Sequence, residues 1–81
     1  MASRVAVISI ILKNSESVEE LNSVVHQYSK YIIGRMGIPY REKKINIISL
    51  AIDAPQDTIS SLAGKLGNID GVSVKTAMSN V

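Results

Sequence analysis

The residues of this sequence most able to do chemistry are four basic side chains beside two glycines and a proline. The basic residues lie in or just after the segment 31–40 and comprise Arg35, Arg41, Lys43 and Lys44. Two interpretations are open. Lysine and arginine protect a sheet edge from pairing with other sheets, or they contact an anion, either a small effector or the acidic surface of a partner.

The same segment predicts a strand that something approaches closely. Glycine weakens a strand, and proline removes a donor from the ladder, so a strand containing both belongs at the edge of a sheet. The molecule expected to approach this strand is a second subunit or a small ligand. The ligand-binding residues that we predict here are Gly34, Arg35, Gly37, Pro39 and Tyr40.

A second candidate is the turn 14–17, between the first predicted strand and helix. Ser17 and Glu20 have the spacing of a capping box, and a capped helix N-terminus offers free N–H groups to a carboxylate or phosphate. We therefore add Asn14 to the predicted ligand-binding residues. The alternative is that Asn14 only shapes the turn.

Other chemistry has little support in the sequence. The chain has one histidine, His26, and no cysteine, so we predict no metal site and no cofactor. The acidic residues are scattered, the serines lack a well-placed base, and Gly34–Gly37 has neither the spacing nor the context of a phosphate-binding loop. We expect no enzymatic activity.

Nucleic-acid binding is also disfavoured. The net charge is only +2, and RNA-binding sheets stack bases on aromatic residues of their central strands. This chain has no Phe or Trp, and its tyrosines lie outside the predicted central strands. Weak binding through the basic residues after the second strand remains an alternative.

Hydrophobic periodicity then predicts the elements that must position these residues. Alternating apolar residues indicate strands, and apolar residues three to four apart indicate helices. The predicted strands are Arg4–Leu12, Ile32–Arg41, Ile45–Asp53 and Val72–Met78. The first helix should begin at Ser17 and end near Lys30, and the second should start with Pro55 as its first residue and be capped by Gly67.

The order β-α-β-β-α-β predicts an α+β, ferredoxin-like sandwich: a four-stranded antiparallel sheet with two helices on one face, in a single domain, 1–81. The first and third strands should be central, and both are apolar on both alternations. The helix-free face would then expose Ile45, Ile47, Ala51 and an apolar row of the first strand. Soluble monomers seldom expose such a patch, so we predict an oligomer or a partner-binding subunit.

The absence of cysteine is typical of a cytoplasmic protein. The apolar stretch near the N-terminus is too short to span a membrane and lacks a small-residue cleavage site, so it is interpreted as a strand.

Nearly the whole chain resembles the small iron-only hydrogenase system regulators. The resemblance is carried by Arg4–Ile11, Tyr31–Tyr40, Asp53–Gly67 and Gly71–Ala77. It implies a domain akin to ACT-type regulatory modules and to the C-terminal effector domain of the nickel-responsive repressor. Those relatives form dimers or tetramers and sense small ligands at subunit interfaces.

Two departures limit what the resemblance implies. The nickel-responsive domain binds metal through histidines and a cysteine, whereas the corresponding strands here offer Arg35, Tyr40, Asn46 and Ser49, so nickel sensing is not expected. No helix-turn-helix or ribbon-helix-helix segment is present, which makes direct DNA binding unlikely. We expect a regulator that is a homo-oligomer, dimer or tetramer, and binds a small anionic effector. The alternative is a subunit that binds a protein partner without any ligand.

Overall fold

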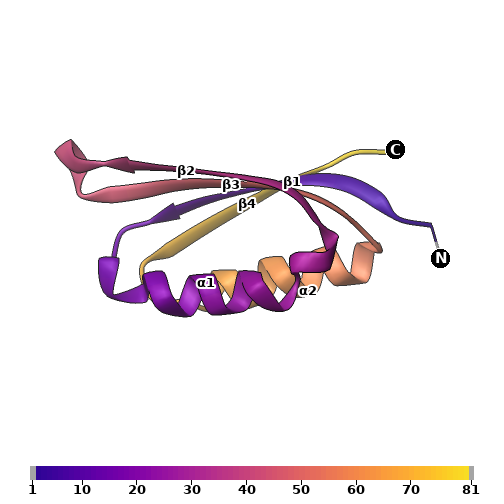
Figure 1. Cartoon of the computed structure of the whole chain (residues 1–81), viewed down its shortest axis with the longest axis horizontal. Helices are drawn as coiled ribbons and strands as arrows, with labels where there is room; N and C mark the ends of the chain where they lie inside the picture. The colour runs from indigo at the N-terminus through magenta and orange to yellow at the C-terminus, as the bar shows by residue number, and fades with distance from the viewer. Residues whose placement is uncertain (1, 81) are drawn as a thin grey trace.

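The computed structural model describes residues 2–80, so residues 1 and 81 of the predicted domain lie outside the described residues. Four strands and two helices follow one another in the predicted order (Figure 1). The strands are β1 (Arg4–Leu12), β2 (Ile32–Tyr40), β3 (Ile45–Ala54) and β4 (Val72–Met78), and the helices are α1 (Val18–Gln27) and α2 (Gln56–Gly67). Short 3-10 turns occupy Ser15–Ser17, Ser29–Tyr31 and Arg41–Lys43.

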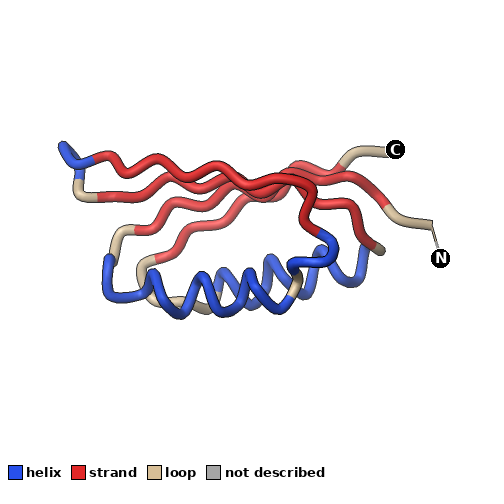
Figure 2. Tube along the Cα trace, in the orientation of Figure 1, coloured by secondary structure: helices blue, strands red, loops and turns tan. Residues whose placement is uncertain are grey.

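The sheet is antiparallel with strand order β2-β3-β1-β4, and both helices lie on one side of it (Figures 1 and 2). The α+β, ferredoxin-like prediction is therefore confirmed, with β1 and β3 central and β2 at an edge. A register irregularity between Ile32 and Gly34 makes Ile33 a bulge residue, which is 64% exposed. Neither α1, with ten residues, nor α2, with twelve, has the length and apolarity needed to cross a bilayer within the described chain.

The core lies between the helices and one alternation of the central strands. Ile8 and Ile10 of β1 and Leu50 and Ile52 of β3 are all fully buried there. They pack with residues spaced three to four apart on the helices, namely Leu21, Val25, Ile59, Leu62 and Leu66. Apolar residues at helical spacing on both helices thus form the core together with the sheet.

The other alternation forms the helix-free side of the sheet, which we call the open face. Residues directly opposite one another in an antiparallel pair share a face. By the observed register, the open face comprises Val5, Val7, Ser9 and Ile11 of β1, Gly34, Met36, Ile38 and Tyr40 of β2, Ile45, Ile47, Ser49, Ala51 and Asp53 of β3, and Ser73, Lys75 and Ala77 of β4. The chain alone leaves this face uncovered, with Val7 and Ile11 about 40% exposed (40% and 41%).

Several predicted boundaries were wrong by a few residues. α1 ends at Gln27 rather than near Lys30, because the chain tightens into a 3-10 turn after Tyr28. β2 ends at Tyr40 rather than Arg41, because Arg41 begins the 3-10 turn of the hairpin. β3 extends one residue past Asp53, because Ala54 still pairs with Arg4.

The predicted helix caps also differ from the structure. Pro55 has an extended ψ of 147° and precedes α2 as its N-cap, so it is not the first helical residue. Gly67 is the last residue of α2, and Asn68 is its C-cap in a right-handed conformation. The capping box at Ser17 does not form, because the Ser17 hydroxyl donates instead to the backbone carbonyl of Asp70 at 3.0 Å.

Candidate ligand-binding groove

A groove lies where the β2–β3 hairpin extends beyond the start of α1, at the left end of the molecule in Figure 1. It consists of two adjoining hollows, which share Pro39 and Asn46 as lining residues. The outer hollow lies between the hairpin and the β1–α1 turn. The inner hollow lies between β2 and the first part of α1.

The outer hollow has a volume of about 510 Å³ and a strongly basic lining. Its nine residues are Lys13, Asn14, Ser15, Pro39, Tyr40, Arg41, Lys44, Ile45 and Asn46. Three of these carry a positive charge and none is acidic. An anion placed there would meet a positive potential together with amide and hydroxyl groups that can form hydrogen bonds.

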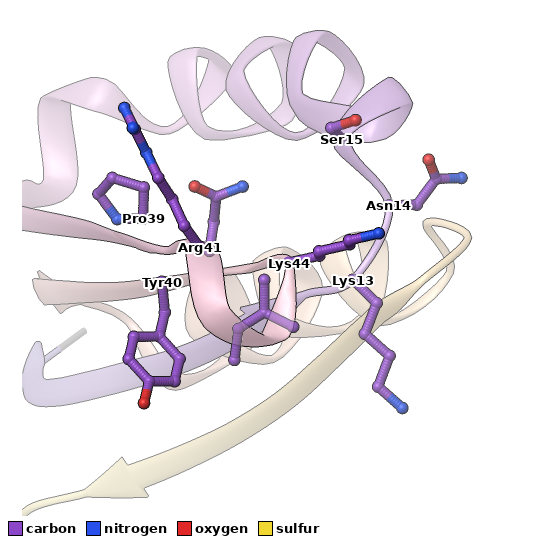
Figure 3. A pocket seen from close by; sticks show the side chains of 9 residues that line it. Lys13, Asn14, Ser15, Pro39, Tyr40, Arg41 and Lys44 are labelled. Atoms are coloured by element: carbon purple, nitrogen blue, oxygen red, sulfur yellow. The ribbon is translucent and has the colours of Figure 1, made fainter.

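The side chains that line the outer hollow point in different directions (Figure 3). Arg41 extends toward the helix layer, and Lys44 extends toward the Asn14 turn. Lys13 and Tyr40 point to the opposite side, away from Ser15. The Tyr40 hydroxyl donates to Glu42 Oε2 at 3.2 Å. Arg41 and Lys44 are therefore the charged side chains of the hairpin that extend toward the helix layer and the Asn14 turn, as their directions in Figure 3 show.

The β1–α1 turn is a fixed wall of this hollow. Asn14 Oδ1 accepts a hydrogen bond from the Glu16 N–H at 3.0 Å, and its amide nitrogen lies 3.4 Å from Asp70 Oδ2. The Lys13 N–H donates to the Gly71 carbonyl at 2.7 Å. Asn14 therefore shapes the turn that forms this wall.

Gly71 explains why this wall sits so close to β4. Its φ of +78° is in the left-handed region that favours glycine. A Cβ at this position would lie 2.8 Å from the Asn14 Cβ, so only glycine lets the two turns touch.

The inner hollow is smaller, about 230 Å³, and more apolar. It is lined by Leu12, Val18, Asn22, Arg35, Gly37, Ile38, Pro39, Asn46 and Ile48. Arg35 Nη2 donates to Asn22 Oδ1 of α1 at 2.6 Å, which links β2 to α1 at this hollow. A Cβ at Gly37 would meet nothing within 4 Å, so the missing side chain leaves open space.

The structure thus places five of the six predicted site residues along one groove. Asn14, Pro39 and Tyr40 line the outer hollow, and Arg35, Gly37 and Pro39 line the inner one. Gly34 lines neither hollow, and its register partner Ala51 places it on the open face.

Sequence reasoning did not place Lys13, Ser15 or Asn46 in the site. Asn46 carried a usable signal: it is the one polar residue of the helix-side alternation that continues through Ile48, Leu50 and Ile52. Lys13 and Ser15 flank Asn14, and no local sequence pattern distinguishes them from other loop residues. Only the fold places them at the hollow. Across residues 2–80 no three acidic or histidine side chains gather closely enough to hold a metal ion.

Comparisons with known proteins agree with this architecture. The family model described as TM1266-like, iron-only hydrogenase system regulator, matches residues 4–76. A UPF0735 ACT domain-containing protein of Lacticaseibacillus casei (strain BL23) is 36% identical over 75 residues, which is 90% of this chain and 52% of that protein. This chain therefore spans about half the length of that curated relative.

A solved structure is also close. The uncharacterized protein TM1266 from Thermotoga maritima superimposes with a TM-score of 0.90 at 36% identity, covering 94% of this chain and 96% of that one. The family match itself reaches from the first residue of β1 into β4. The chain belongs to the TM1266-like family of iron-only hydrogenase system regulators.

Proposed function

We propose that this chain is a non-enzymatic regulatory module that binds a small anion in the outer hollow and acts as a homo-oligomer. The observation that carries the ligand is the basic lining, with Lys13, Arg41 and Lys44 around one hollow and no acidic residue in it. The family's description as a hydrogenase system regulator and the ACT domain of the curated relative support a regulatory, ligand-sensing role.

The open face supports the oligomer. Six of its side chains are large, apolar and at least 36% exposed in the single chain: Val7, Ile11, Met36, Ile38, Tyr40 and Ile47. Water covers such a contiguous surface at a free-energy cost of about 25 cal/mol per Å². A second copy of the same face would remove that cost.

The size of the open face suits a dimer. Strands about 4.8 Å apart that rise about 3.3 Å per residue give a four-stranded, nine-residue face of roughly 19 by 30 Å. Side-chain relief makes the accessible area larger than this flat projection. Stable interfaces bury roughly 800 Å² per partner, so the face supplies most or all of what a dimer needs.

The β2–β3 hairpin connects the proposed anion binding with the proposed assembly of copies. Arg41 and Lys44 belong to the turn that joins β2 to β3, and Tyr40 and Ile45 at its base lie on the open face. A ligand held by the hairpin would therefore favour one arrangement of the copies over another, which is the requirement for allosteric coupling.

Anion binding can be tested with inorganic phosphate as the probe, measured by isothermal titration calorimetry. Combining Arg41→Ala with Lys44→Ala should weaken binding about a hundredfold or more, because charge-assisted hydrogen bonds contribute about 1.5–3 kcal/mol each. The matched control is Lys30→Ala, which removes one exposed positive charge beyond the end of α1. The phosphate affinity of this variant should stay within about twofold of wild type, because salt screens the interaction between exposed charges that lie far apart.

Native mass spectrometry of the protein purified from its own host complements this titration, since it reports retained small molecules and copy number together. Absence of phosphate binding in the millimolar range, combined with no retained anion, would remove the ligand from the proposal.

The exposed apolar face also favours a second candidate, a subunit that docks onto another protein and has no ligand. A pull-down from native extract distinguishes the two, because a stoichiometric partner that persists without metabolites supports docking alone. Binding to random DNA across a salt series tests the basic hairpin, since phosphate contacts impose a steep salt dependence.

A further inference from the structure

The groove contains two chemically different spaces in line. The outer hollow is basic, and the inner hollow beyond Pro39 and Asn46 is mainly apolar. Together their volumes lie well inside the size range of small-molecule sites, which is roughly 300–1,000 Å³. A compact inorganic anion would fill only the outer part.

The inner hollow is lined mainly by apolar groups that suit a hydrocarbon part of a ligand. Leu12 and Ile48 are buried core residues that form its floor, and Val18 is half-buried at its side. The Arg35–Asn22 hydrogen bond of 2.6 Å links β2 to α1 beside these walls. An alkyl or aryl group that enters would displace water from the apolar walls formed by Leu12, Val18 and Ile48.

Gly37 keeps the inner hollow open. It shares the helix-side alternation of β2 with Arg35 and Pro39, opposite Ile48. A Cβ there would contact nothing within 4 Å, so no packing within the described chain requires glycine. A strand loses stability by having glycine in its interior, and the space that this residue leaves is part of the hollow.

We infer that the ligand is an amphipathic anion whose charged head occupies the outer hollow and whose apolar arm enters the inner hollow along Gly37. This rests on the proposed anion-binding function and specifies its ligand class. Pro39 and Asn46 mark the point where the head joins the arm. The head is a carboxylate or a phosphate, because both suit lysine, arginine and amide donors.

The test uses two series of probes of increasing chain length, straight-chain carboxylates and monoalkyl phosphates, each from one to six carbons. Wild-type affinity should rise about fourfold for each methylene that becomes buried, which corresponds to about 0.8 kcal/mol, and should level off when the inner hollow is full. The series that binds more tightly at equal chain length identifies the head group.

Gly37→Val is the diagnostic variant, because its side chain occupies the inner hollow while the outer hollow is unchanged. Its affinity for the shortest probe should match wild type, and its chain-length dependence should be flat. Gly34→Val is the matched control: a Cβ there also meets nothing within 4 Å, but the residue lies on the open face. It should retain the wild-type dependence.

Gly37→Ala serves if the valine variant does not fold, and it should shorten the chain length at which affinity levels off. Wild-type binding of inorganic phosphate without any chain-length effect would overturn the amphipathic ligand and leave the proposed function standing. A chain-length effect that survives Gly37→Val would overturn the assignment of the arm to the inner hollow. Failure of every probe, inorganic phosphate included, would overturn both proposals.

Discussion

The two faces of the sheet use the same strands and nearly the same residue types, but only one is covered. Ile8 and Ile10 of β1 are fully buried beneath the helices, whereas their neighbours Val7 and Ile11 are about 40% exposed (40% and 41%). The difference arises because two helices cover only one side of four strands. Apolar residues on both alternations of a strand therefore indicate that both faces favour burial. They do not identify what covers each face.

The faces differ in one further respect. The helix side of the central strands is aliphatic without interruption from Ala6 to Ile10 and from Ile48 to Ala54. Across the middle of the open face, Ser49, Ser9 and Lys75 form a polar row on β3, β1 and β4. A face interrupted in this way tolerates water better than the core does.

The largest expected effect is on the covered face. Leu50→Ala should lower the free energy of unfolding by about 2–5 kcal/mol, because Leu50 is fully buried and the helices can only partly collapse onto the gap. Denaturant unfolding monitored by circular dichroism measures the change.

The matched control is Ile47→Ala on the open face of the same strand. In dilute, dissociated protein it should cost less than about 1 kcal/mol, since the side chain is already partly solvated. Equal losses for Leu50→Ala and Ile47→Ala in that state would show that the faces do not differ as described.

A smaller loss is expected from Gly71→Ala, at the turn that holds the groove wall. The positive φ and the 2.8 Å approach to the Asn14 Cβ predict a loss of about 1–3 kcal/mol. Gly34→Ala on the open face should leave the stability of the dissociated chain nearly unchanged, because its Cβ meets nothing. Thermal unfolding of both variants compares a glycine needed within the fold with one that is not.

Ser17→Ala tests the buried polar group on the helix side. Its hydroxyl donates to the Asp70 carbonyl at 3.0 Å, and removing it should cost about 1–2 kcal/mol, because the carbonyl loses its partner. The exposed Ser60 provides the control, since Ser60→Ala leaves no buried group unpaired. A Ser17→Ala protein as stable as the control would mean that the two turns are not held together by this bond.

The smallest effect is a pH dependence from Tyr28, the C-cap of α1. Hydrogen bonding of its hydroxyl to Ser61 at 2.9 Å, with Lys65 close by, lowers the pKa of Tyr28 below its ordinary value of 10.0. The folded state then releases this proton at lower pH than the unfolded state does, so stability rises slightly with pH between the lowered pKa and the unfolded value. Unfolding measured across this alkaline range should show the rise in wild type and not in Tyr28→Phe.

Much of the fold was predictable from local pattern. β1 and β4 were placed without error, because a nearly continuous apolar run marks β1, alternation marks β4, and turns flank both strands. The errors at Ser17 and Gly67 have separate causes. The Asp70 carbonyl, brought close by the turn before β4, takes the Ser17 hydroxyl, and the chain after α2 turns at Asn68 without a left-handed glycine.

The site was less predictable for a geometric reason. The segment 34–40 was singled out correctly as an unusual edge strand, but its residues alternate between two faces. Gly37 and Pro39 enter the groove while Gly34 turns to the open face. That division, and the nearness of Lys13 to Lys44, depend on strand register and on how far the hairpin extends past α1, which no local pattern specifies.

The most direct test of the account is the mass of the protein in solution by size-exclusion chromatography with light scattering at micromolar concentration. Wild type should have at least twice the 8.7 kDa of one chain, and Ile47→Asp, which places a charge in the middle of the open face, should reduce it to a single chain with unchanged helical content. A wild-type protein that is strictly monomeric under these conditions, with its open face simply hydrated, would contradict the account.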